Sequence, residues 1–302
     1  MRWQPDVARG AWIAERLDAG ALTASMHSVV PRGFAAYARI FHPLEGQRPI
    51  GMTWQELRRD PEHWPRGWEQ RSTTWRSLAR ELGVTWHPLV QWESIVRASG
   101  EDGRWNGVPG LDGWRYGDPM TGSPGTPAFA TIARVLERHT ATPDAGQAAV
   151  WEGHGGLFSN DGVSVLRWFA DDEVESERDS DAEPSAAPPL GPEVDAGPRL
   201  ELPARSHVLF DAGVGELTDD SWPERAPWTR DAGPWSVTPS LVWPDDRAWV
   251  LVGEVDYDST IVAGNAELVA QLLDTPGLEV EEIPEGADLS STGDALNGPR
   301  GG

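Results

Sequence analysis

Three acidic side chains occur at alternate positions in one short segment late in the chain: Glu254, Asp256 and Asp258. They follow an apolar run and are expected on the same strand, where every second side chain shares a face and lies about 7 Å from the next. Carboxylates at that spacing repel one another unless water, a cation or arginine lies between them. Three interpretations are open: a solvated outer face, pairing with first-half arginines such as Arg32 or Arg39, and a divalent-cation or catalytic acid site.

An acid and a base stand close together in the string VWEGHGG, which contains Trp151, Glu152 and His154. A carboxyl group and an imidazole at one strand end are the groups that general acid–base catalysis needs. No third partner follows at a recognisable spacing, and a histidine in a glycine turn is typically exposed to solvent. These three residues are therefore candidates for binding, and no catalytic residue is predicted.

The string WPDDRAW, from Trp243 to Trp249, has the composition of a strand–turn–strand corner. Proline suits a turn position, and aspartate side chains accept hydrogen bonds from the backbone there. Arg247 is expected to stack on Trp243 or Trp249. The corner is interpreted either as a structural turn or as the rim of a binding cleft.

Composition excludes several kinds of chemistry. Cysteine is absent, which excludes disulfides, thiolate ligands and a cysteine nucleophile, and all 25 basic residues are arginine, which excludes a Walker lysine or a Schiff base. The serines lack the G-x-S-x-G setting of a hydrolase nucleophile. His27 and His42 have no recognisable third metal ligand nearby in the sequence. The sequence thus predicts no metal and no cofactor.

Tryptophan is unusually frequent, with 17 residues in 302. Seven of them lie between Trp54 and Trp105, among several arginines, so cation–π pairs are expected in this region. The tryptophans have no fixed period. They are interpreted either as packing residues of the core and its rim or as a stacking platform for a sugar ring or a base.

Negative charge is concentrated in the second half of the chain. Residues 1–150 carry 17 arginines and 16 acids, whereas residues 151–302 carry 8 arginines and 32 acids. Ten of those acids fall within 171–198, a stretch with five prolines that is predicted to be a disordered acidic insertion. It is interpreted as a solubilising loop or as an interaction segment for a basic protein. A chain this acidic is not expected to bind nucleic acid.

No targeting signal is expected at the N-terminal end of the chain. The N-terminal segment lacks a continuous apolar stretch because Asp6, Arg9 and Glu15 interrupt it, so no signal peptide is expected. No run of 18 apolar residues is present, so no membrane span is expected, and the predicted location is the cytoplasm. Residues 284–302 are expected to form a flexible tail.

Helices are expected mainly in the first half and strands mainly in the second. Periodicity and capping signals predict helices at 7–18, 74–82, 88–98, from 126 and at 266–273, with a capping box at Thr53 and a cap at Asn265. Strands are expected at 148–152, 163–170, 206–211, 240–243 and 248–262. The fold predicted is a single α+β domain over 1–302, with a helical part at 1–145 and a mostly antiparallel sheet at 146–283.

Several strings together resemble a family of uncharacterised proteins from high-GC actinobacteria. These strings are VWEGHGG (150–156), RSHVLF (205–210), SLVWPDDRAWVLVGEVDYDSTIVAG (240–264), TIARVLERHTATPD (131–144) and MHSVVPRGFAAYARIFHP (26–43). The resemblance covers most of the chain except the acidic insertion and the tail. It implies a shared fold and an organism class, and no chemistry.

Two classes of function remain. The first is a non-enzymatic cytoplasmic module that binds a basic protein, as an immunity or antitoxin-like protein or an adaptor would, because acidic surfaces steer encounters with basic partners. The second is an enzyme or binder of a small polar ligand such as a sugar, using tryptophans and the 254–258 carboxylates. The sequence leaves the oligomeric state open.

Overall fold

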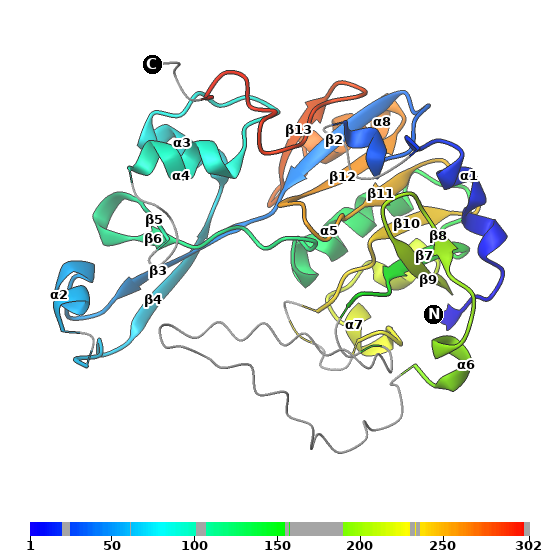
Figure 1. Ribbon diagram of the computed structural model, residues 1–302, viewed down its shortest axis with the longest axis horizontal. Helices are drawn as coiled ribbons and strands as arrows, with labels where there is room; N and C mark the ends of the chain where they lie inside the picture. Colours follow the sequence, from blue (N-terminus) through cyan, green and yellow to red (C-terminus); the bar gives the residue numbers. More distant parts are fainter. Residues whose placement is uncertain are drawn as a thin grey trace.

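The computed structural model describes residues 1–19, 25–60, 62–100, 107–154, 157, 190–229, 233 and 236–298. Helices and antiparallel sheets are both present, which gives the chain an α+β fold (Figure 1). The expected strand at 163–170 and residues 171–189 of the expected acidic insertion lie outside the described residues.

Nine strands of the described chain form one large sheet. They are β1 (Arg2–Trp3), β2 (Ala36–Phe41), β7 (Gly146–Trp151), β8 (Leu200–Glu201), β9 (Ser206–Asp211), β10 (Leu241–Pro244), β11 (Val250–Val252), β12 (Ser259–Gly264) and β13 (Glu279–Ile283). Their order is β1-β9-β7-β10-β11-β12-β2-β13, with β8 also paired to β9, and every pair is antiparallel. Strands distant in sequence are therefore neighbours, as in the pair of β7 and β9.

Both faces of this sheet are covered. On one face lie α5 (Thr126–Glu137), α8 (Ala266–Leu273), the 3-10 turn η4 (Val214–Leu217) and α7 (Trp222–Arg225). On the other lie the 3-10 turns η1 (Val7–Gly10) and η2 (Met26–Ser28) together with α1 (Ala11–Ala14). Alternate strand residues enter opposite cores, so that Val242 packs in the first core and Leu241 in the second.

A second, four-stranded sheet projects from the large one (Figure 1). Its strands are β3 (Leu44–Pro49), β4 (Trp68–Thr73), β5 (Val108–Pro109) and β6 (Arg115–Tyr116), in the order β4-β3-β6-β5, with helices α2 (Trp54–Arg59), α3 (Trp75–Leu82) and α4 (Trp92–Ser99). It lies wholly within the expected helical part, 1–145, which therefore contains a sheet as well as helices. Apolar alternation does not reveal three of these strands. β5 and β6 have only two residues each, and β4 is polar and almost fully exposed.

Two segments expected to be disordered or flexible are packed where the structure describes them. Residues 190–198 contain α6 (Pro192–Asp195), whose Val194 is buried, and Arg199 donates hydrogen bonds to the carbonyls of Val194, Asp195 and Gly197. In the predicted tail, Ala287, Leu289 and Asp294 are buried. Both predictions are corrected for these residues, because apolar side chains there complete the core of the large sheet and arginine satisfies the last helical carbonyls.

Candidate functional site

The expected strand 248–262 is interrupted, and this changes the geometry of its carboxylates. β11 ends at Val252 and β12 begins at Ser259, so Glu254, Asp256 and Asp258 lie on the connection between them. The backbone turns there, with the Tyr257 N–H donating to the Glu254 carbonyl at 2.9 Å. The expectation that the three carboxylates share one strand face is therefore wrong, because side chains on a turn do not alternate.

Arg205 brings four of the sequence-predicted residues together. Its Nε donates to Glu254 Oε1 at 2.6 Å, and its Nη2 donates to Asp256 Oδ2. Its guanidinium carbon lies 4.8 Å from the centre of the Trp151 ring, whose edge-to-face neighbour at 5.4 Å is His154. No sequence pattern singles out Arg205, because only the fold places the start of β9 beside the turn after β11.

The electrostatics of this cluster favour a paired, desolvated arrangement. Glu254 is 4 % exposed, and burial raises the pKa of its carboxyl while Arg205 opposes that rise. Burial lowers the pKa of His154 and of the neighbouring His207 to about 4, with the charge of Arg205 acting in the same direction. Both imidazoles are thus neutral near pH 7, and neither one carries a positive charge toward Glu254.

Asp258 and Glu152, the other two predicted acids, are bound by other arginines. Arg39 is 1 % exposed and donates to Asp258 Oδ1 at 3.2 Å, to Ser259 Oγ at 3.0 Å and to the Val90 carbonyl at 2.8 Å. Pairing with a first-half arginine, one of the three interpretations of the carboxylate segment, is confirmed for Asp258. Glu152 accepts from Arg199 Nε at 3.0 Å.

The WPDDRAW corner is built into the core. Trp249 is fully buried and donates from Nε1 to the Leu136 carbonyl at 3.0 Å. Trp243 is 2 % exposed and packs edge to face on Trp12, with ring centres 6.2 Å apart. Arg247 lies over the ring of Trp12 at 5.4 Å, which corrects the prediction that it stacks on Trp243 or Trp249. These contacts support the interpretation of the corner as a structural turn.

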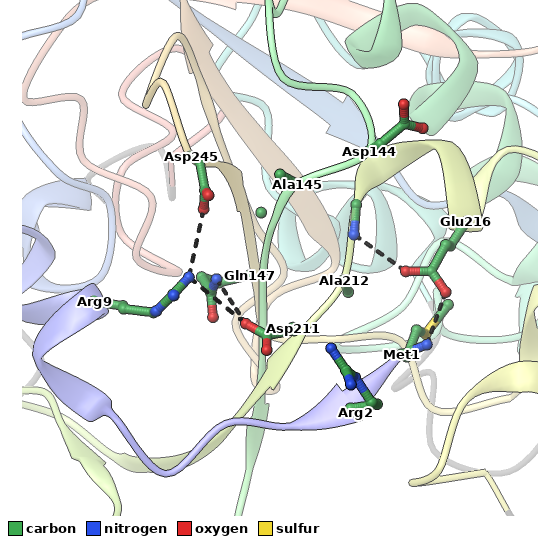
Figure 2. A pocket seen from close by; sticks show the side chains of 12 residues that line it. Met1, Arg2, Arg9, Asp144, Ala145, Gln147, Asp211, Ala212, Glu216 and Asp245 are labelled. Carbon is green, nitrogen blue, oxygen red and sulfur yellow. Dashed lines mark hydrogen bonds and ion pairs between the residues drawn. The ribbon is translucent and has the colours of Figure 1, made fainter.

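A wide pocket lies elsewhere, at the ends of β7, β9 and β10, and Figure 2 shows it from close by. It encloses about 470 Å³. The charged groups that line it are the carboxylates of Asp144, Asp211, Glu216 and Asp245, the guanidinium groups of Arg2 and Arg9 and the amino group of Met1. No short motif could reveal this site, because each acid comes from a different turn or strand end.

Glu216 is bound by the amino group of Met1 at 2.7 Å, but the three aspartates of this pocket have no cation within hydrogen-bonding distance among the described residues. Arg9 Nη1 lies 3.7 Å from Asp211 and 3.9 Å from Asp245, beyond hydrogen-bonding distance to either (Figure 2). Asp211 accepts instead from the amides of Gln4, at 2.9 and 3.1 Å, and Gln147, at 3.2 Å. The Asp144 and Asp245 side chains accept no hydrogen bond from any residue that the structure describes. The pocket therefore retains acceptor capacity.

The floor of the pocket adds another acceptor. Gln147 is 1 % exposed, and its Oε1 has no hydrogen-bond partner among the described residues. Figure 2 shows its side chain between Arg9 and Asp211. Within the described ranges no group of three or more histidine and carboxylate side chains is arranged to hold a metal ion. An arrangement rich in acceptors suits a donor-rich organic cation.

Among the residues that the structure describes, no helix has both the length and the apolar character that crossing a membrane requires. Comparisons of the chain with models of protein families, with curated proteins and with solved structures found no match.

Proposed function

We propose that this protein is a non-enzymatic module that binds a basic partner protein, and that the pocket of Asp144, Asp211 and Asp245 receives a cationic side chain of that partner. The proposal rests on one observation: several hydrogen-bond acceptors in this pocket have no donor within bonding distance among the described residues. Asp144 and Asp245 accept no hydrogen bond from the described residues, and the Gln147 Oε1 atom at the floor is unpartnered.

A guanidinium group matches this chemistry better than an ammonium group. It presents five N–H donors in a planar fork, so it can bridge two carboxylates that lie on different strands. Arg9 already demonstrates that an arginine fits between Asp211 and Asp245, although at distances of 3.7 and 3.9 Å it forms ion pairs only. A partner arginine entering the 470 Å³ pocket would supply the hydrogen bonds that Arg9 does not.

The charge of the chain supports the same kind of partner. The second half carries 32 acids against 8 arginines, and such an excess attracts basic proteins over distances longer than direct contact. A cytoplasmic immunity or antitoxin-like protein, or an adaptor, would use a surface of this kind. The assignment to that role rests on charge and chemistry alone.

The 254–258 carboxylates support this proposal less than the pocket does. Glu254 and Asp256 are bound by Arg205, and Asp258 is bound by Arg39. Three acids that are already paired with arginines of the same chain have little to offer an incoming cation. We therefore place partner binding at the pocket and assign the 254–258 segment to the stability of the fold.

The direct test is an NMR titration of the full chain with a short arginine-containing peptide, beside the same peptide with citrulline in place of arginine. Citrulline keeps the shape of the side chain and removes its charge. We expect shifts of the amides of 144–147 and 211–213 with the arginine peptide only. The double variant Asp144→Asn/Asp245→Asn should weaken binding at least about tenfold, equivalent to about 1.4 kcal/mol.

Two controls make this test decisive. Asp274→Asn removes an exposed acid outside the pocket, at the end of α8, and should leave the affinity unchanged. Equal binding of the citrulline peptide, or shifts that spread over other surfaces, would contradict the proposal. A rise in melting temperature with sugar, nucleotide or divalent cation concentration would instead favour the small-ligand alternative.

A further inference from the structure

The small sheet has an open edge at β4 (Trp68–Thr73). This strand is the last in the order β4-β3-β6-β5, so β3 is its only neighbour among the described strands (Figure 1). Its four central residues are exposed, and its backbone forms no hydrogen bond with any described segment other than β3. An open strand edge presents unpaired N–H and C=O groups that can pair with another extended chain.

The ladder with β3 shows which backbone groups of β4 face the open side. The Gly117 N–H donates to the Glu45 carbonyl at 3.1 Å, so the backbone of Glu45 is directed toward β6 and away from β4. Ser72 lies opposite Glu45, and its own N–H and C=O are therefore directed away from β3. Because this direction alternates along a strand, Gln70 and Trp68 also present their backbone groups outward.

The sequence of β4 is complementary to a second copy of itself. In an antiparallel pair centred on Gln70, the two copies of Gln70 face each other and Trp68 faces Ser72 of the partner subunit. These are pairs of outward backbone groups, so they form main-chain hydrogen bonds. Glu69 then lies opposite Arg71 of the partner subunit, and the reverse pair forms as well. Opposite charges at such positions stabilise a strand pair.

The same two charges disfavour the neighbouring registers. Moving the centre of the pair by one residue, to Glu69 or to Arg71, places two like charges directly opposite each other, which destabilises the pair. A centre that falls between two residues sets outward backbone groups opposite inward ones and loses the hydrogen bonds. The register centred on Gln70 therefore satisfies the backbone and the charges together.

Both charged side chains are accessible to a second copy. The Glu69 carboxylate is bound by Arg48 of the same sheet, but its side chain is 44 % exposed, so further donors can reach it. Arg71 donates from Nε and Nη2 to the Tyr116 hydroxyl, and its Nη1 forms no hydrogen bond with the described residues. Glu69 and Arg71 lie two positions apart and thus share one face of β4.

We propose that this protein forms a symmetric dimer by antiparallel pairing of two β4 edges, with Gln70 on the two-fold axis. The small sheets of the two copies join into one continuous sheet, and the symmetry repeats each contact. A single pair of strands buries little surface, so the dimer dissociates on dilution. The pocket of Asp144, Asp211 and Asp245 is built from the large sheet, so this inference is independent of the proposed function.

The test is sedimentation velocity of the full chain over a range of concentrations, where wild type should show a monomer–dimer equilibrium. Glu69→Arg places two positive charges opposite each other, and Arg71→Glu places two negative charges opposite each other. Each variant alone should self-associate at least about tenfold more weakly than wild type. An equal mixture of the two variants restores both pairs of opposite charges, and the dimer should form again.

Gln70→Pro provides a test that does not depend on charge. Proline removes the outward N–H at the centre of the pair and leaves the N–H groups that face β3, so the dimer should be lost while circular dichroism stays unchanged. Asp220→Arg makes the same change of charge as Glu69→Arg at an exposed acid outside the small sheet, and should leave the dimer intact. If Arg71→Glu does not fold, Glu69→Arg and Gln70→Pro decide. A wild-type chain that stays monomeric at millimolar concentration, or a dimer that survives these substitutions, would overturn the proposal.

Discussion

Replacing Arg205 by alanine would leave the carboxylate of Glu254 buried without its counter-charge. Glu254 is 4 % exposed, and Arg205 Nε donates to it at 2.6 Å. Removing one partner of a buried ion pair costs about 3–5 kcal/mol, whereas an exposed pair contributes about 1 kcal/mol or less. Asp256, the other partner, has a side chain that is 67 % exposed. We therefore expect Arg205→Ala to destabilise the fold by about 3–5 kcal/mol and Asp256→Asn by about 0.5 kcal/mol.

The stability loss of Arg205→Ala should also depend on pH. Burial already raises the pKa of Glu254, and the loss of Arg205 should raise it further. A carboxyl whose folded pKa is above its unfolded value holds its proton better in the folded state. Its ionisation therefore lowers stability as the pH rises above the unfolded value of about 4.3. The deficit of Arg205→Ala relative to wild type should be smaller at pH 5 than at pH 7.

Urea unfolding followed by circular dichroism at both pH values measures these differences. The double variant Arg205→Met/Glu254→Gln removes both charges together and should recover a large part of the lost stability, because apolar or neutral replacements of a buried pair are often close to neutral. A cost below 1 kcal/mol for Arg205→Ala, independent of pH, would refute the assignment of the 254–258 segment to internal pairing.

Three further predictions follow from buried contacts. Burial lowers the pKa of His42 to about 4, so wild type should lose up to about 3 kcal/mol relative to His42→Asn as the pH falls from 6.5 to 4, measured by urea unfolding. Gly213→Ala would place a Cβ 2.5 Å from a backbone carbon of Asp144 and should lower the melting temperature, whereas Gly117→Ala meets no atom within 4 Å and should not. Truncation after Ile283 exposes the core beneath Ala287 and Leu289, and proteolysis should become faster.

Local signals in the sequence predicted local structure well. Thr53 forms the expected capping box, and Asn265 caps α8 over the expected residues. The strand expected at 206–211 is β9. A cation–π pair expected between Trp54 and Trp105 is present, with the guanidinium carbon of Arg76 at 5.1 Å from the centre of the Trp86 ring. These features depend on a few neighbouring residues whose side-chain chemistry is sufficient to specify them.

Features that depend on contacts between distant segments were not predictable. Arg205 meets Glu254 only because β9, β7, β10 and β11 are adjacent in the sheet. The pairing of Gln147 with Asp211 likewise requires the register of β7 on β9. The strand expected over 248–262 is too long because Val255 and Tyr257 continue the apolar alternation of β11 through the turn, so the pattern does not mark the break.

Aspartates are common in turns because their side chains bind the turn backbone, and this could by itself account for the acids at the ends of β7 and β10. Asp246 fits that explanation, since it accepts from the backbone N–H of Ala141 at 2.7 Å and of Ala248 at 3.1 Å. Its neighbour Asp245 and the nearby Asp144 line the pocket and make no such bond with the described residues. The turn backbone donates hydrogen bonds to the Asp246 carboxylate, whereas neither of the other two carboxylates accepts one from the described residues. It is this difference in hydrogen bonding, more than the number of acids, that points to a cation from outside the chain.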